Sequence, residues 1–393
     1  MRLDKPRAAV TLAGFCAFLG LYAPQVVMPQ LAESFHVSEA VAASTVGIST
    51  LAVALSAPLS GMLTDRIRRK TTILAAVLAL AVPTVLLVLS ADLSQILVWR
   101  FLQGLFIPAI LSSTVAYISE EWPAEQASGV MGYYIAGSAL GGFSGRFVTA
   151  LMAGSFGWKS GSFALGLLTL LCALAIWRWL PAGAARGRGG AAQASAFGAL
   201  KLHLSNPALL ATYAVGFSVL FSMVATFTYV NFHLAAPPFS LSVSALGMIF
   251  LVYPIGAAVT PSSGHLIRRF GRRGAMVLAL GTSALGLVCT MGGSVALVVA
   301  GLALFVTGVF VAQTSATGFV GQTAKVSRTT AVGIYVCCYY LGGSAGAELP
   351  GLTVWHSAGW AGCVGLVMAV LLGAGALAWW AWRPRLPRGV PAE

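Results

Sequence analysis

The chain has 393 residues, of which 58% are hydrophobic and 8% are charged, and its mean hydropathy is +0.87. A soluble domain carries about 25% charged residues, so this chain cannot cover a water-facing surface and lipid is its expected solvent. The formal charge of +13 does not indicate nucleic-acid binding, because the basic residues lie in short segments between apolar runs. The six cysteines lie inside apolar runs without metal-ligand spacing, so we expect neither a metal nor a cofactor.

Twelve apolar runs are long enough to cross a bilayer, which takes about 20 mostly apolar residues. Membrane strands would alternate polar and apolar residues, and these runs do not, so each is predicted to be a helix. The first run is too long for a signal peptide and is predicted to remain in the mature protein. The predicted spans are 8–30, 41–63, 71–90, 95–119, 127–153, 158–180, 207–232, 243–265, 274–293, 295–320, 329–353 and 358–382.

The distribution of lysine and arginine predicts that both termini face the cytoplasm. With the N-terminus inside, twenty of the 23 basic residues fall in cytoplasmic segments, and Lys159 is the basic residue of the outer loops. The other two, Arg100 and Arg146, lie inside predicted spans. The opposite orientation would place nearly all of this charge outside, against the positive-inside rule.

Two segments recur at a nearly constant offset, which indicates a duplicated unit. Residues 58–70 match 261–273 at an offset of 203, with six identities in thirteen positions. Residues 132–145 match 333–346 at an offset of 201, again with six identical positions. Two independent matches at nearly equal spacing are typical of a membrane protein built from two copies of one bundle.

The longest polar break separates the two copies. It begins at Pro181 and is rich in glycine and arginine, which is typical of a flexible linker. We therefore predict an all-α integral membrane protein with two pseudo-symmetric six-helix bundles. The predicted parts are an N-terminal bundle at 1–180, a cytoplasmic basic linker at 181–206 and a C-terminal bundle at 207–393.

The charged connector at 58–70 has features of both a topology signal and a hinge. Its basic residues alone satisfy the positive-inside rule, which is the simpler interpretation. That rule does not account for the lone carboxylate of Asp65 or for the repeated Gly61. Asp65 can pair with Arg66 or Arg69, or lie at a helix N-terminus, where it would be favourable by about 0.3–1 kcal/mol. We favour a functional hinge.

The motif Gly61-x-Leu63-x-Asp65-Arg66-x-x-Arg69-Lys70 resembles the loop 2–3 signature of the major facilitator superfamily, with Arg68 where the family commonly has glycine. The resemblance covers the whole chain and implies the major facilitator fold. In that family the loop is a cytoplasmic latch that closes against the start of helix 11. The resemblance implies that Asp65 faces the start of helix 11 near Thr329 and Thr330, and that Arg69 reaches Glu120 and Glu121 at the end of helix 4. The implied latch is Gly61, Asp65, Arg66, Arg69, Lys70, Glu120 and Glu121.

The second copy of this loop has Arg268 where the first has Asp65. The two loops are therefore not equivalent. We expect control of the conformational switch to lie mainly in the first half of the chain.

The segment Arg100-Phe101-Leu102-Gln103-Gly104 resembles the helix 4 signature of the same family. An intramembrane arginine costs at least about 2.5–3.5 kcal/mol, so Arg100 should face a wet cavity or a partner. The alternative is an anchor at the membrane interface. We favour the cavity and place Gln103 beside it in the substrate pathway.

Glycines form a ladder in predicted helix 5 and again in helix 11, which indicates close helix packing. The helix 5 ladder resembles the signature of drug:proton antiporters, but it lacks their Gly-Pro pair. The residue patterns around both ladders most resemble those of a subgroup of bacterial inner-membrane efflux transporters. The packing glycines are Gly137, Gly141, Gly142, Gly145, Gly342, Gly343 and Gly346.

Two charges follow the ladders, Arg146 in helix 5 and Glu348 in helix 11. A carboxyl group inside a span can take up and release a proton, so Glu348 is a candidate coupling site; the alternative is a salt bridge or cap near the outer side. With Arg100, the charges inside the spans sum to +1, which favours an anionic, zwitterionic or neutral substrate. Further candidates for the pathway are Tyr22, Gln25, Tyr213, Asn231, Tyr253, Gln313, Tyr335 and Tyr339.

These patterns predict a secondary transporter of a bacterial inner membrane that works by alternating access. We expect proton-coupled efflux of a small organic solute or drug, by antiport. The alternatives are a proton-coupled importer of an organic anion and a non-transporting receptor or scaffold. No catalytic motif is present, so we do not expect an enzyme. The expected partners are a small-molecule substrate, protons and the lipid bilayer, with no nucleic acid, and the chain is expected to act as a monomer.

Overall fold

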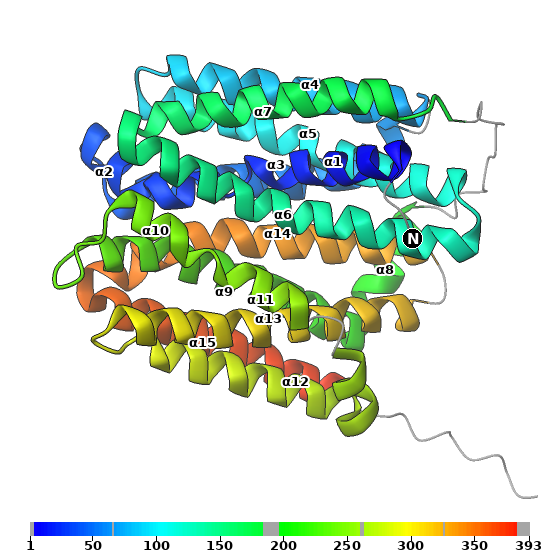
Figure 1. The fold of residues 1–393 in the computed structure, drawn as a ribbon. Helices are drawn as coiled ribbons and strands as arrows, with labels where there is room; N and C mark the ends of the chain where they lie inside the picture. Colours follow the sequence, from blue (N-terminus) through cyan, green and yellow to red (C-terminus); the bar gives the residue numbers. More distant parts are fainter. Residues whose placement is uncertain (1–3, 65–66, 184–195, 260–262, 325–326, 383–393) are drawn as a thin grey trace, which may run out of the picture.

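The computed structural model describes residues 4–64, 67–183, 196–259, 263–324 and 327–382. In this part of the chain every regular element is a helix (Figure 1). The helices are α1 (Lys5–Leu19), η1 (Ala23–Val27), α2 (Met28–Phe35), α3 (Glu39–Thr64), α4 (Arg69–Leu86), η2 (Leu87–Leu89), α5 (Leu93–Glu121), α6 (Ala124–Phe156), α7 (Trp158–Trp179), α8 (Ala196–Leu204), α9 (Pro207–Ala235), α10 (Val243–Ile249), α11 (Val252–Val259), α12 (Ser263–Cys289), α13 (Val295–Thr323), α14 (Arg328–Thr353) and α15 (Trp355–Ala381).

Eight of the described helices are long and apolar enough to cross a membrane, and the bent pair Lys5–Leu19 and Ala23–Phe35 would make a ninth. The remaining predicted spans correspond to α6, α14 and the broken pair α10–α11. Helices α6 and α14 have 33 and 26 residues, and their many glycines and small polar residues lower their hydropathy. The predicted twelve-helix fold is therefore confirmed, and α10–α11 differs from the other spans in being short and broken, not in being polar.

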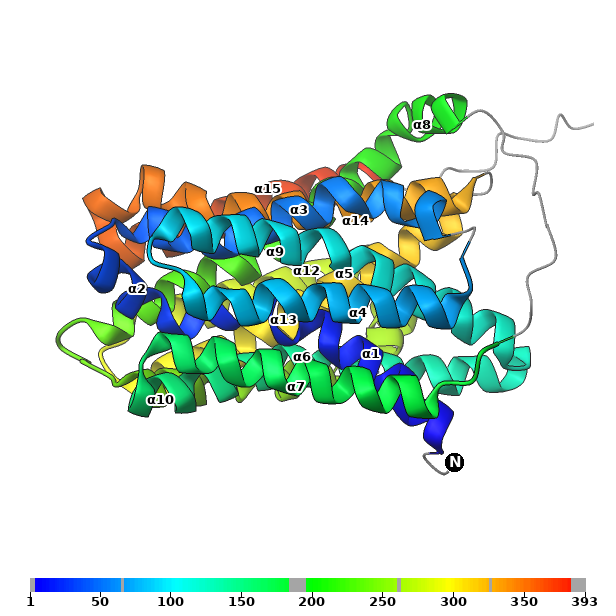
Figure 2. The same ribbon diagram turned by 90° about the horizontal axis from the view of Figure 1, so that it is seen from above.

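The helices before the linker form one bundle and those after it form the other, and the two lie against each other (Figure 1). Both views show the long helices running between two ends of the molecule (Figure 2). We call the end where α1 begins and α8 lies the linker end. The end that holds α2 and α10 is the opposite end. The predicted cytoplasmic side corresponds to the linker end.

The first predicted span is not one straight helix, because it breaks after Leu19. The two parts are bent by 41°. Pro24 has no N–H to donate to the carbonyl of Gly20, four residues earlier. The N–H of Gln25 bonds to Tyr22 instead of continuing the α-helical pattern. The break therefore leaves the carbonyls of Gly20 and Leu21 without helical partners.

The glycine ladders pack each bundle in the same way. A Cβ at Gly141 or Gly145 would overlap the carbonyls of Phe15 and Leu19 on α1. In the other bundle, a Cβ at Gly342 or Gly346 would overlap the carbonyls of Phe217 and Phe221 on α9. Gly137 and Gly343 are also closely packed, the latter against side chains of α9 and α3. The residues at the two contacts keep the spacing of the sequence repeat, so the duplication extends to the packing of the helices.

Gly142 differs from the packing role predicted for it. A Cβ added at Gly142 would lie 3.7 Å from Arg146 Nη1 and 3.9 Å from Phe18 Cβ, which are ordinary contact distances. The position borders a cavity instead of a neighbouring helix backbone. A methyl group at Gly142 would therefore fit beside the side chain of Arg146.

Two boundaries differ from the predicted spans. The eighth span, predicted to reach residue 265, ends at Val259, and Ser263 already belongs to α12. Helix α12 then breaks at Gly271, whose φ of 69° lies in the left-handed region that favours glycine.

The linker contains α8, and His203 Nε2 of that helix lies 3.2 Å from the carbonyl oxygen of Ser327, just before α14.

Candidate functional site

A cavity of about 530 Å³ lies between the two bundles, and we call it the central cavity. Its walls come from α1, η1 and α6 of the first bundle and from α9, α11, α13 and α14 of the second. Most of the lining is apolar, with a few polar side chains, as is typical of small-molecule sites. Its polar and aromatic lining residues are Phe18, Tyr22, Gln25, Ser138, Phe143, Arg146, Tyr253, Phe310, Gln313 and Tyr339.

Arg146 is the charged residue of this lining, and aromatic rings surround it. Its Cζ atom lies 4.8 Å from the ring centre of Tyr22, 4.9 Å from Phe250 and 4.6 Å from Tyr253. The residue as a whole is only 3% exposed. A guanidinium group over an aromatic face gains about 0.5–2 kcal/mol, more when water is excluded. The three rings therefore replace part of the solvation that bulk water would give this cation.

Hydrogen bonds fix the orientation of the Arg146 guanidinium. Nε donates to Gln25 Oε1 at 2.8 Å, Nη1 to the Gly142 carbonyl at 2.8 Å, and Nη2 to the Tyr253 hydroxyl at 3.3 Å. A guanidinium has five N–H donors, so about two remain for a ligand. The described lining of the cavity contains no aspartate or glutamate. Arg146 is thus a buried cation whose counter-charge is not provided by the cavity wall.

The same cluster connects the two bundles. Gln25 of η1 donates from Nε2 to Thr228 Oγ1 of α9 at 3.1 Å. Arg146 of α6 bonds to Tyr253 of α11, so a second hydrogen bond crosses the boundary. Both contacts join an element before the linker to one after it. Any motion that separates the bundles here must break these bonds, so a ligand at Arg146 would compete directly with the contact between bundles.

Closer to the opposite end, the bundles are in tight contact. A Cβ at Gly154 would overlap Ser244 of α10, and a Cβ at Gly247 of α10 would overlap Ala150 of α6. A Cβ at Gly351 would similarly crowd Ala40 of α3. Small residues at these points allow the helix backbones to approach closely. The opposite end is therefore closed beyond the central cavity.

Arg100 does not line the central cavity, in contrast to the predicted pathway role. Its Nη1 and Nη2 donate to the carbonyls of Gly20 and Leu21, the groups freed by the break in the first span. Its Nε donates to the Thr45 carbonyl at 2.8 Å. Nη1 also donates to Gln103, whose amide reaches Thr84. Arg100 and Gln103 thus stabilise the bent helix inside the first bundle, and only a cavity of about 30 Å³ lies beside Arg100.

Glu348 lies where α14 packs on α3, outside the lining of the central cavity. Its carboxylate is next to Gly47, close enough that a Cβ there would lie 2.5 Å from Oε1. In the described part of the chain, no hydrogen bond or ion pair to this carboxylate is found, so the salt bridge considered from the sequence is not seen there. The position is half-buried at the boundary between the bundles. A change in its charge would therefore act on the contact between the two bundles.

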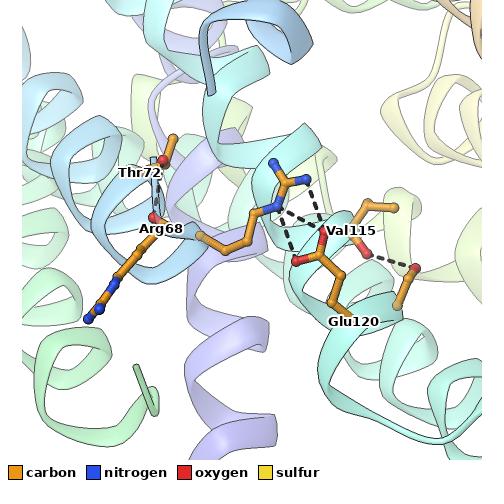
Figure 3. A network of polar contacts seen from close by, with 6 residues as sticks. Arg68, Thr72, Val115 and Glu120 are labelled. Carbon is orange, nitrogen blue, oxygen red and sulfur yellow. Dashed lines mark hydrogen bonds and ion pairs between the residues drawn. The ribbon is translucent and has the colours of Figure 1, made fainter. Parts of the chain in front are cut away.

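The predicted contact between Arg69 and Glu120 is present. Arg69 Nη2 lies 3.0 Å from Glu120 Oε1, and Nε donates to both carboxylate oxygens at 3.3 Å (Figure 3). The pair joins the start of α4 to the end of α5, where Thr72 donates to the Arg68 carbonyl at 3.3 Å. Asp65 and Arg66 lie outside the described residues, as does the contact predicted between Asp65 and helix 11. The latch function of the pair remains a prediction.

Among the predicted pathway residues, the structure brings together Tyr22, Gln25, Arg146, Tyr253 and Tyr339. Gln313 joins them, since its Nε2 donates to the Tyr339 hydroxyl at 3.2 Å. Tyr335 is buried behind Tyr339, with ring centres 6.2 Å apart, and does not line the cavity. Phe250 and Thr228 were not predicted.

The fold and the cavity together define a class of protein. A twelve-helix membrane protein with two related bundles and a site at their boundary has the architecture of a secondary transporter. A family model described as the Major Facilitator Superfamily matches residues 10–347. The chain belongs to the Major Facilitator Superfamily.

Relatives and solved structures agree with this family. The chain is 31% identical to the inner membrane transport protein YnfM of Escherichia coli (strain K12), over 93% of this chain and 87% of that protein. It is 30% identical to the 4-hydroxybenzoate transporter PcaK of Pseudomonas putida, over 39% of this chain and 35% of that protein. It resembles a bacterial homolog of the human lysosomal transporter Spinster in its inward-facing and occupied conformation. That match has a TM-score of 0.77 and 16% identity, covers 95% of this chain and 96% of that chain, and shows the fold alone.

Proposed function

We propose that the protein exports a small organic anion in exchange for protons, and that Arg146 binds the anionic group. Membership of the family supports secondary transport, and the chemistry of the central cavity supports the substrate class. The observation that carries the proposal is a buried guanidinium with spare donors and no acidic residue in the described lining. A carboxylate would supply the missing charge and accept those donors.

The aromatic rings around Arg146 favour an organic anion over a small inorganic one. Tyr22, Phe250 and Tyr253 present apolar faces next to the cation. Such a wall can stack on an aromatic or unsaturated substrate while the guanidinium holds its carboxylate. The similarity of part of the chain to a transporter named for 4-hydroxybenzoate makes that aromatic carboxylate a suitable first probe.

Alternating access would follow from the contacts between the bundles. The opposite end is closed in this structure, so we infer that the cavity is reached from the linker end, which we place in the cytoplasm. Opening toward the opposite end would break the Gln25–Thr228 and Arg146–Tyr253 hydrogen bonds. A bound anion would replace the Tyr253 hydroxyl as a partner of Arg146 and so lower the cost of this separation.

Proton coupling would involve Glu348, because it is a carboxylate at the moving boundary between α14 and α3. Loss of its charge would allow the bundles to slide past each other with a neutral side chain in the boundary. We propose that the loop after α3, with Asp65 as its acidic residue, controls the same motion at the linker end. The drug:proton antiporter subgroup is part of this proposal.

The second candidate is a proton-coupled importer of an organic anion, which Arg146 supports equally. Uptake of one negative charge into a cell with a negative interior costs about 2.3 kcal/mol per 100 mV. A co-transported proton would cancel that cost. A receptor or scaffold is a weaker alternative, since it needs no 530 Å³ cavity with a buried cation.

The test is transport into liposomes that contain the purified protein, with a pH gradient imposed in either direction. Three probes of similar shape would be compared: 4-hydroxybenzoate, the neutral 4-hydroxybenzyl alcohol and the cationic tyramine. We expect the anion to be transported at least about tenfold faster than either other probe, and against the proton flux. Movement along the proton flux would assign import. Preference for tyramine would contradict the anion proposal.

A further inference from the structure

A second cavity, of about 460 Å³, lies between α12 and α15 on the side of the second bundle away from the first. It shares no lining residue with the central cavity. We call it the α12–α15 groove. Residues that shape it include Arg273, Val277 and Gly281 on α12 and Gly375, Trp379 and Trp382 on α15.

Arg273 is the charged residue of the described groove lining. Its Cζ atom lies 5.1 Å from the ring centre of Trp379. Its Nε and Nη2 atoms are shielded from solvent, and in the described part of the chain neither has a hydrogen-bond acceptor. Shielded donors without partners are costly, which favours a negatively charged group at this position.

The neighbouring Arg272, unlike Arg273, donates a hydrogen bond to a described side chain. Its Nη2 donates to Gln322 Oε1 at 2.6 Å, and its Cζ lies 5.3 Å from the Phe319 ring centre. Arg272 therefore has a protein acceptor as well as an aromatic neighbour. Arg273 has the aromatic neighbour alone among the described residues, so the difference between the two lies in the missing acceptor.

The length of the groove matches a lipid chain. Arg273 and Gly281 are eight residues apart, which corresponds to about 12 Å along a helix. Half of the hydrocarbon core of a bilayer is about 15 Å thick. An added Cβ at Gly281 would meet nothing within 4 Å, so the deeper part of the groove is open. Trp379 and Trp382 lie near the linker end, where tryptophan marks the headgroup level.

We propose that the α12–α15 groove binds one anionic phospholipid, with the phosphate on Arg273 and an acyl chain along Val277 and Gly281. The charge and the apolar wall are parts of one site in helices that cross the membrane. A basic pocket between spanning helices at the membrane surface is suited to an anionic headgroup. This site is separate from the transport cavity.

Another groove of the same volume shows why the charge matters. It also measures about 460 Å³ and is lined by residues such as Leu210, Phe217, Leu341 and Leu377. Its described lining contains no charged side chain. Lipid chains of any headgroup can occupy such a surface. Of these two grooves, the α12–α15 groove adds a charged donor in its described lining, and such a donor distinguishes an anionic lipid from a zwitterionic one.

The experiment is native mass spectrometry of the full-length protein in detergent, titrated with phosphatidylglycerol or phosphatidylcholine of identical chains. We expect tighter binding of phosphatidylglycerol, and an about tenfold loss of this binding in Arg273→Gln, as for one charge-assisted hydrogen bond. Arg178→Gln removes an exposed arginine at the end of α7 and should leave binding unchanged. Gly281→Phe should fill the groove and weaken binding while Arg273 is kept, so it tests the site even if Arg273→Gln does not fold.

Equal binding of phosphatidylglycerol by the parent, Arg273→Gln and Gly281→Phe would overturn the proposal. Displacement of the lipid by excess inorganic phosphate or glycerol 3-phosphate would assign the site to a soluble anion and overturn it as well. Equal affinity for phosphatidylcholine and phosphatidylglycerol would show that the groove is an unspecific apolar surface and would also overturn the proposal. Retention of phosphatidylglycerol in the presence of excess phosphate would support the proposed lipid site.

Discussion

Arg272 Nη2 lies 2.6 Å from Gln322 Oε1, and this contact repeats the Arg69–Glu120 ion pair of the first bundle with the negative charge removed. The two arginines are related by the offset of 203, and Glu120 and Gln322 by 202. Each contact joins the start of one span to the end of the next. The bundles thus share a geometry while only the first keeps a full ion pair there.

Glu120→Gln should make the first bundle resemble the second. Glu120 is 43% exposed, and such pairs contribute about 0–1 kcal/mol, so the melting temperature should change little. If the pair belongs to the latch, the transport rate should fall several-fold and lose part of its dependence on salt. Gln322→Glu is the matched control and should leave the rate near that of the parent. Equal rates in all three proteins would remove the latch function from this pair.

Arg146→Gln should weaken binding of an anionic substrate about 10- to 100-fold, because a charge-assisted contact is lost. Arg146→Lys should restore only part of the affinity, since an ammonium cannot donate to Gln25, Gly142 and Tyr253 in the planar arrangement of a guanidinium. The measurement is the Kd of 4-hydroxybenzoate and of its neutral alcohol. An equal loss for both ligands would indicate a structural role instead.

Arg100→Gln should lower the stability of the protein without changing its preference for the charge of the substrate. The change removes donors from the buried carbonyls of Gly20, Leu21 and Thr45. Each unsatisfied buried group costs about 1–3 kcal/mol, so the loss should exceed about 3 kcal/mol. The yield of monodisperse protein and its thermal unfolding report this. Protein that folds should keep the anion preference of the parent, the reverse of what Arg146→Gln should show.

Gly141→Ala should destabilise the first bundle by about 1–3 kcal/mol, because its methyl group would overlap the Phe15 carbonyl and overpack the contact with α1. The adjacent Gly142→Ala is the control, since its nearest contacts of 3.7 and 3.9 Å are ordinary. Thermal unfolding in one detergent compares the two. A similar loss for both variants would show that the ladder does not set the helix distance.

Glu348→Gln should abolish transport driven by a pH gradient while leaving exchange of substrate across the membrane. The neutral amide keeps the size of the side chain against Gly47 but can no longer bind or release a proton. Uptake and counterflow in liposomes at several pH values measure the two activities. A pH profile that matches the parent would exclude Glu348 as the coupling site.

The sequence by itself determined the number of spans and the duplication, because both depend on local properties. Apolar length predicts a span regardless of its neighbours, and two matched segments reveal a repeat without any knowledge of packing. The Arg69–Glu120 contact was also predicted, because a family motif and a rare pair of acids pointed to the same end of the bundle. The glycines could be assigned to close packing for similar reasons, with Gly142 as the exception.

Only the tertiary structure decided what each intramembrane arginine does. Arg100 and Arg146 carry the same charge and are both buried, so the sequence could not separate them. Arg100 is satisfied by carbonyls that a proline-induced break exposes on another helix. Arg146 lies among aromatic rings from both bundles at the boundary between them. The difference depends on contacts between residues far apart in the sequence, such as 80 positions for Arg100 and Gly20 and 121 for Arg146 and Gln25. The folded arrangement of helices creates these contacts, and no local pattern records them.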